Sequence, residues 1–390
     1  MPRSTLVICR VAGVVALVTA AAPLAGQVPS GALATSWRFR PSFASEAEFD
    51  NNVFLLPDKK KASVVGGAEA GSRFAQMESA SDVVTTTRAV LAFAGPGIGG
   101  RRLSLVPEIG YELYAQNAAR RGLTYGIGIT QKTRRGEALR LTADIRPARF
   151  FKNYLVDAVD RDADGTITPD ERLYGSADQA ETTLDADYTF ALRSLGTALR
   201  LGGGWYSRAY QQQFRARDLK GPTARAQLLL ELGRDVRLDF GYSRAGLTAP
   251  RTLAVVLVDE PAFGRDFNGN GTTTDLNARA VAMVDHSRTE QELSASFESG
   301  FGLANLELEF ARRTRSYHSA EPYDVGNNGR RDARNELGGG MRFDLGSAVR
   351  LRLRAQHSAQ TVNRVNEAAP TGDVADYART RVSMGLEYRF

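Results

Sequence analysis

The sequence predicts an all-β fold, namely an antiparallel, up-and-down β-barrel of about 14 strands that crosses a membrane. Three observations support this prediction. An export signal precedes the rest of the chain, segments of roughly ten residues alternate apolar and polar side chains, and short and long connections alternate between those segments. A tilted strand needs roughly 9–11 residues to cross the apolar layer, and only closure satisfies its backbone there.

Residues 1–26 have the features of a secretory signal peptide. Arg3 and Arg10 are basic, an apolar stretch follows at 11–18, and small residues such as Ala25 provide a cleavage site. The apolar stretch is too short for a membrane-spanning helix. The only cysteine, Cys9, lies within this segment, so a mature chain at 27–390 would have no disulfide or thiolate metal site. Losing two arginines and no acids would lower the formal charge from +6 to +4.

The predicted strands alternate with a period of two, so each has an apolar and a polar face. The first, at 37–49, presents Trp37 and Phe39 on one face and Arg38 and Arg40 on the other. The same alternation recurs at 101–114, 138–147, 183–193, 349–358 and 379–390. It is less regular at 81–94, 123–132 and 220–232, so the count of fourteen carries a margin of two. A soluble β-sandwich would show the same local pattern, so alternation alone does not decide between the two.

The connections between the predicted strands favour a barrel that spans a membrane. Short turns are expected near 95–100, 133–136, 194–196, 233–235, 299–302 and 344–347. Long connections are expected near 50–80, 115–123, 153–181, 213–221, 247–286, 315–335 and 359–376. Six short turns and seven long loops join fourteen strands and leave both ends of the barrel on the short-turn side. Short turns facing the periplasm and long extracellular loops are the layout of bacterial outer-membrane barrels.

The polar faces of the predicted strands carry so many charges that they cannot form a dry core. Two interpretations remain open. The arginines and carboxylates form a network that rigidifies a narrow lumen, or they line a diffusion pore with charge selectivity. The candidate lumen and selectivity residues are Arg38, Arg40, Arg140, Arg146, Arg350, Arg352, Arg354 and Arg381.

One acidic stretch, DRDADGTITPDE at 160–171, has the ligand spacing of a calcium loop. Gly165 stands where such a loop turns sharply, and the candidate oxygen ligands are Asp160, Asp162, Asp164, Thr166, Thr168 and Glu171. The flanking segments do not form two convincing helices, so we expect a bound Ca²⁺ to order the loop and not to open a helix pair. The alternative is an acidic, turn-rich loop without metal.

A second stretch, DFNGNGTTTDLN at 266–277, repeats the beginning of the pattern with Asp266, Asn268 and Asn270 as candidate ligands. Its last position is Asn277, which is no bidentate carboxylate, although Asp275 is near. Fewer negative ligands predict weaker binding. A third stretch, from Asp324, is explained by Asn-Gly turn chemistry.

No signature of an enzyme or of a nucleic-acid-binding module is present. Histidines 286, 318 and 357 stand in no nucleophile motif, and Asp285 and Ser287 beside His286 would point to the opposite face of a strand. The sequence contains no Gly-x-Ser-x-Gly and no phosphate-binding loop. The arginines are dispersed among apolar residues and do not form one basic patch, so the high pI gives no reason to expect nucleic acid as a partner.

The chain resembles the porin-type outer-membrane β-barrel proteins of Gram-negative bacteria. The resemblance lies in the signal peptide, the final strand RVSMGLEYRF ending in Phe390, and the opening stretch FASEAEFDNNVFLLP. In that superfamily a terminal Phe preceded by alternating apolar residues is the usual assembly signal. The resemblance implies an outer-membrane location, contact with outer-membrane lipid and passive diffusion of small polar or charged solutes. It also allows a homo-oligomer, although the residues themselves show no subunit interface. The 160–171 loop resembles that of EF-hand proteins.

Three functions are compatible with these observations. The first is a porin or channel with external loops ordered by calcium. The second is a structural or adhesive surface barrel with a closed lumen. The third is a secreted, soluble, all-β calcium-binding protein.

Overall fold

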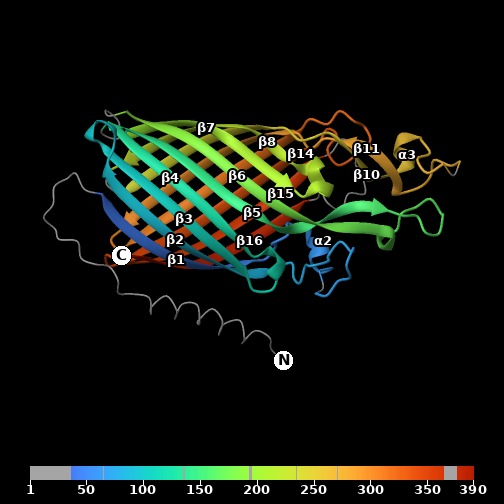
Figure 1. Cartoon of the computed structure of the whole chain (residues 1–390), viewed down its shortest axis with the longest axis horizontal. Coiled ribbons are helices and arrows are strands. Elements are labelled where there is room, and N and C mark those ends of the chain that lie inside the picture. The colour runs from blue at the N-terminus through green and yellow to red at the C-terminus, as the bar shows by residue number, and fades with distance from the viewer. Residues whose placement is uncertain are drawn as a thin grey trace, which may run out of the picture.

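Fourteen antiparallel strands close into a barrel, as the sequence predicts (Figure 1). The computed structural model describes residues 37–64, 66–134, 137–192, 196–233, 235–269, 271–363 and 376–390, and the expected signal peptide lies outside them. The barrel strands are β1 (Arg38–Asp50), β2 (Asp82–Pro96), β3 (Arg102–Tyr114), β4 (Gly122–Arg134), β5 (Glu137–Ala158), β6 (Arg172–Leu192), β7 (Thr197–Tyr210), β8 (Leu219–Leu232), β9 (Val236–Leu247), β12 (Arg288–Phe301), β13 (Ala304–Tyr317), β14 (Arg331–Leu345), β15 (Val349–Asn363) and β16 (Tyr377–Arg389).

Pairing between the first and last strands closes the barrel. Phe43 on β1 faces Tyr388 on β16, and Phe49 faces Val382, all on the outer face. Consecutive barrel strands pair with each other, except that β9 pairs with β12. The two strands between them, β10 (Thr252–Val258) and β11 (Ala278–Val284), form a separate hairpin that lies beyond the end of the barrel with α3 (Glu260–Phe263).

Short turns lie at one end of the barrel and long connections at the other, as predicted. One boundary is wrong, however: the connection expected at 153–181 is only 159–171, because β5 runs to Ala158 and β6 begins at Arg172. These two strands have 22 and 21 residues and extend beyond their neighbours. Their register shifts at three places, beginning between Arg146 and Arg149. Such bulges interrupt the two-residue period on which the sequence prediction depends.

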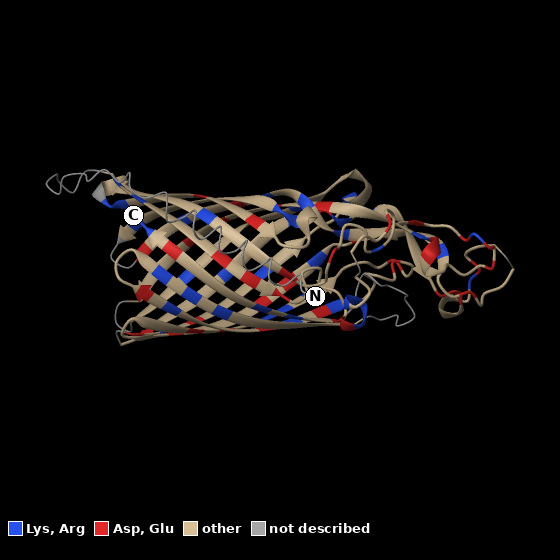
Figure 2. Ribbon diagram, turned by 90° about the horizontal axis from the view of Figure 1, so that it is seen from below, with Lys and Arg blue, Asp and Glu red and all other residues tan. Residues whose placement is uncertain are grey.

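Large apolar side chains cover the outside of the barrel, and Figure 2 shows basic and acidic positions interspersed along its strands. All fourteen strands expose at least one such side chain: Phe39, Leu91, Ile109, Ile127, Leu141, Leu184, Leu201, Leu228, Phe240, Leu293, Phe310, Leu337, Leu353 and Met384. Phe39 and Phe49 lie ten residues apart on β1. That separation spans about 25 Å at a rise of ~3.3 Å per residue and a tilt of ~40°, which is the height of the apolar band of membrane barrels.

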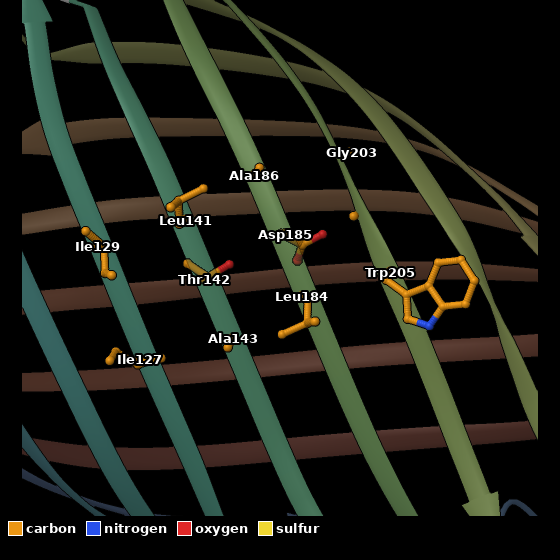
Figure 3. A pocket seen from close by; sticks show the side chains of 11 residues that line it. Ile127, Ile129, Leu141, Thr142, Ala143, Leu184, Asp185, Ala186, Gly203 and Trp205 are labelled. Atoms are coloured by element: carbon orange, nitrogen blue, oxygen red, sulfur yellow. The ribbon is translucent and has the colours of Figure 1, made fainter.

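A hollow in this outer surface lies over β4 to β7 (Figure 3). Ala143, Ala186 and Gly203, which have small or no side chains, leave space there beside Leu184 and Trp205. The residues that line it are almost all apolar, as is expected where acyl chains, and not water, meet the wall. None of the helices in the described part of the chain is long and apolar enough to span a membrane.

The connection 51–81, which contains α2 (Asp58–Lys61), packs against the inner wall at the mouth of the barrel. Phe54, fully buried, forms an apolar cluster with Val84 of β2, Tyr114 of β3 and Phe150 of β5. Asn153 Nδ2 on β5 donates to the carbonyl oxygens of residues 73 and 75 in the connection. A loop held by both apolar and polar contacts narrows the mouth.

Candidate functional site in the lumen, its mouth and the acidic loops

Arginine–carboxylate pairs that bridge second-neighbour strands line the lumen. Nη2 of Arg352 on β15 lies 3.0 Å from Oε2 of Glu307 on β13, and Arg354 pairs with Glu309 on the same two strands. The strand between them, β14, carries the glycine triplet 338–340. The arginines reach across β14 because two of these glycines present no side chain to the lumen.

A second glycine triplet, at 202–204 on β7, lies beneath a similar bridge. Arg225 on β8 donates to Asp187 on β6 through Nε and Nη2, and its Nη1 lies 3.2 Å from Oδ1 of Asp185. A Cβ on Gly202 would stand 2.0 Å from Oδ1 of Asp187. The absence of a side chain on Gly202 therefore leaves room for the ion pair that crosses β7.

The paired charges in the lumen remain in contact with solvent space. The side chains of Arg352 and Glu307 are 44% and 33% exposed, and those of Arg88 on β2 and Glu108 on β3 are 54% and 34% exposed. Packed interiors leave charged groups nearly inaccessible, because desolvating them is costly. Such exposure indicates a lumen with room for water.

The structure gives the eight arginines named from the sequence different surroundings. Arg352 and Arg354 make the bridges described above, and Arg350 pairs with Asp344 at 2.7 Å and with Glu387 at 3.5 Å. The longer pairs are Arg381 with Glu48 and Arg146 with Glu181, both at 3.8 Å. Within the described part of the chain, no ion pair includes Arg38, Arg40 or Arg140.

A polar cavity of about 180 Å³ lies in the mouth, between the connection 51–81 and the opposite wall. Eight basic side chains line it, and none of its described lining residues is an aspartate or glutamate: Arg73, Lys152, Arg208, Arg217, Arg288, Arg315, Arg330 and Arg334. Tyr154, Tyr210, Tyr317 and Tyr377 lie among them. Strand alternation signals only some of these residues in the sequence, and nothing in it shows that segments so far apart along the chain meet in one place.

Carboxylates on the same or neighbouring strands form ion pairs with several arginines of the mouth. Glu290 Oε1 accepts a 2.7 Å hydrogen bond from Nε of Arg288 and lies 3.2 Å from Nε of Arg315. The N–H of Arg315 is not aimed at that oxygen, so its buried Nε has no hydrogen-bond partner in the described chain. Nε of Arg334 is buried in the same way, although its Nη2 lies 2.7 Å from Glu336.

The first acidic loop brings three of its six predicted ligands together. Asp160, Asp162 and Asp164 each place a carboxylate oxygen within 4.8 Å of the others. Oδ1 of Asp160 is buried without a hydrogen-bond partner, while its Oδ2 accepts from the N–H of Gly165 at 2.8 Å. The N–H of Thr166 donates to Asp164 Oδ1 at 2.7 Å. Three converging carboxylates, one with an unsatisfied oxygen, suit a hard cation such as Ca²⁺.

Two of the remaining three predicted ligands, Thr168 and Glu171, cap the short helix η3 (Pro169–Glu171), and the cluster of metal-ligating side chains contains the three aspartates only. Both oxygens of Glu171 accept hydrogen bonds, Oε1 from the N–H of Arg161 at 2.6 Å and Oε2 from the N–H and the hydroxyl of Thr168 at 2.8 and 2.7 Å. These bonds, the hydroxyl first, lower the pKa of Glu171 to about 2.

The second acidic loop contacts the first. Asn268 Nδ2 donates to the carbonyl of Gly165 at 3.2 Å and to Asp275 Oδ2 at 2.7 Å, so its amide acts as a donor. The two oxygens of Asp266 accept from the N–H groups of residues 269 and 271. Asn270 lies outside the described residues. Below the loops, Ile167 packs on Leu257 of β10, so the hairpin β10–β11 and the extended β5–β6 strands form one external unit.

The sequence matches no protein family model and no curated protein. Solved structures with a similar fold include the outer membrane channel DcaP of Acinetobacter baumannii, 9% identical over 94% of this chain and 100% of that one, with a TM-score of 0.44. They also include a loop L8 deletion mutant of OmpT, an outer membrane protein of Vibrio cholerae, at 8% identity, 92% and 100% coverage and a TM-score of 0.42. A Pseudomonas aeruginosa FadL homologue is 12% identical, with 90% and 88% coverage and a TM-score of 0.40. At these values the similarity describes the fold alone.

Proposed function

We propose that this protein is a channel of the bacterial outer membrane, through which small polar or charged solutes diffuse passively. The observation that carries the proposal is the lumen wall, where pairs such as Arg352–Glu307 and Arg88–Glu108 keep a third or more of each side chain exposed. A barrel that served only as a scaffold would gain stability by filling this space with apolar side chains. A soluble protein would not expose apolar side chains on every strand.

The test is single-channel recording from the refolded mature chain in planar bilayers. We expect discrete conductance steps, because ions pass through a water-filled lumen. Insertion is checked separately by protease protection and by heat-modifiable gel migration. Inserted protein without conductance would support the closed surface barrel, and protein that stays in solution would support the soluble alternative.

We further propose that the external unit binds Ca²⁺ at Asp160, Asp162 and Asp164. The buried, unpartnered Oδ1 of Asp160 supports this site, since a cation would satisfy it. Desolvation first, and then the nearby carboxylates of Asp164 and Glu171, raise the pKa of Asp162. Because Gly165 contacts Asn268, an ion there would order both acidic loops.

Calorimetry with Ca²⁺ tests this second proposal. Asp160→Asn together with Asp164→Asn should abolish the tightest binding event. Asp266→Asn, on the second loop, is the matched control and should leave that event in place. Binding that survives the double substitution would show that the ligands lie elsewhere.

A further inference from the structure

We propose that the cavity in the mouth of the barrel is a binding site for small oxyanions, that is carboxylates or phosphate. The inference rests on the proposed channel function, and it assigns to that channel the class of solute that it prefers. The site consists of residues on the connection 51–81, on β5, β7 and β8, on β12 to β16, and on the connections that contain Arg217, His286 and Arg330. It lies at the long-loop end of the barrel.

The charge of the cavity lining supports an anion. All eight charged side chains among its described lining residues are basic, and the acids that pair with three of them, Glu290, Asp332 and Glu336, are not among those lining residues. Pairing reduces the positive potential of the cavity without making it negative, because no aspartate or glutamate is among its described lining residues. A cleft lined by one sign of charge concentrates ions of the opposite sign.

The hydrogen-bond donors of the lining support an oxyanion in particular. An arginine has five N–H donors in a planar fork that fits carboxylate and phosphate oxygens. The pairs in the wall use only some of these donors, and Nε of Arg315 and Nε of Arg334 are buried with no partner in the described residues. Unsatisfied buried donors are costly, so an oxygen acceptor in the cavity would be favoured.

Aromatic rings hold the basic groups in position. The guanidinium of Arg217 lies 3.6 Å from the ring centroid of Tyr154, and that of Arg330 lies 4.2 Å from the ring centroid of Tyr317. Nε and Nη2 of Arg330 donate to Asp332 at 2.7 and 2.6 Å. Groups fixed by stacking and by ion pairs lose little freedom when an anion binds, which favours binding.

The size of the cavity limits the ligand to a small anion. Its volume of about 180 Å³ is below the ~300–1,000 Å³ of sites for drug-sized ligands. Leu55, Leu56 and Met77 form part of its wall, so a carboxylate with a short apolar portion fits as well as an inorganic anion.

The experiment measures block of the chloride current by inorganic phosphate and, in a separate arm, by acetate, with the full barrel in planar bilayers. The test variant is Arg315→Gln, chosen because Glu290 keeps its 2.7 Å bond to Arg288 and is not left unpaired. The control is Arg237→Gln, which removes the same charge from the lumen near the opposite end, beside Asp239. Arg315→Lys keeps the charge but loses the fork. Heat-modifiable migration verifies that each variant is folded.

Both anions should block the wild-type current, with the half-blocking concentration about tenfold higher in Arg315→Gln, since a hydrogen bond to a charged group is worth that much. Arg315→Lys should fall between the two, and Arg237→Gln should match the wild type. Block by one anion alone would restrict the site to that ligand class. A conducting channel without block, or an equal effect of both glutamine variants, overturns the site.

If the inserted barrel does not conduct, the proposed channel function fails, and the site is then tested by titrating phosphate into the refolded protein in a calorimeter. Binding that weakens in Arg315→Gln but not in Arg237→Gln would support the site without a channel. Absence of binding would overturn it.

Discussion

Adding a single methyl group at Gly202 should destabilise the barrel. A Cβ there would lie 2.0 Å from Oδ1 of Asp187 and 2.8 Å from the carbonyl oxygen of Ala186. The carboxylate of Asp187, which is 5% exposed, would have to leave its two hydrogen bonds from Arg225. Overpacking of this kind costs about 1–3 kcal/mol, against a gain of about 0.5–1 kcal/mol from replacing a strand glycine. Losing a hydrogen bond to a charged group adds about 1.5–3 kcal/mol, so we expect a net loss of about 2–5 kcal/mol.

Gly246→Ala on β9 is the matched control, because no atom lies within 4 Å of the added Cβ. It should stabilise the barrel by about 0.5–1 kcal/mol, since alanine has less backbone entropy to lose. Urea titration of both variants in lipid vesicles, followed by tryptophan fluorescence, gives the two shifts. The reasoning predicts shifts of opposite sign. Shifts of equal sign and size would refute it, because they would show that the ion pair across the glycine triplet contributes nothing.

Three further predictions concern the outer face, the acidic loop and the end of the chain. Leu141→Arg should cost about 2–4 kcal/mol in the same titration, whereas Thr142→Arg, on the lumen face beside Asp185, should cost less than about 1 kcal/mol. Because the folded-state pKa of Glu171 is lowered to about 2 from 4.5, its stabilising bonds persist above pH 4.5 and are lost as the pH falls to about 2. The amide NMR shift of Thr168 should follow this change, and should not do so in Glu171→Gln. Deleting Phe390 should lower the fraction of barrel that migrates as folded on unheated gels, and undiminished assembly would argue against a role for the terminal residue.

The sequence predicts the barrel well because its outer face repeats one rule on every strand. The irregular strands β2, β4 and β8 were predicted from connection lengths as much as from alternation, and all three are present. The long β5–β6 extension was missed because its bulges break the period. Glu171 was assigned as a metal ligand from spacing alone, and spacing does not show that the Thr168 hydroxyl is close enough to compete for its oxygens.

The lumen is harder to predict, because its contacts depend on which strands become neighbours. Alternation places Arg352 and Glu307 on the polar face, but it does not show that they meet. The two glycine triplets, on β7 and β14, are the feature of the sequence that could have indicated these pairs. Where the middle one of three strands has no side chain, an arginine on one outer strand can reach a carboxylate on the other. The mouth offers no such signal, because its lining comes from strands between β5 and β16 and from the connection 51–81.

Arginine lets one set of side chains serve both the stability of the wall and the selectivity of the lumen. The sequence has 50 basic residues, and all but six of them are arginines. A lysine that paired with a carboxylate would have only two other donors on a single nitrogen, whereas an arginine in the wall keeps N–H groups that point elsewhere. Removing a paired arginine therefore leaves a carboxylate exposed and changes the stability together with the charge. Arg315 is the position at which selectivity can be tested with little change in stability, because Glu290 keeps its bond to Arg288.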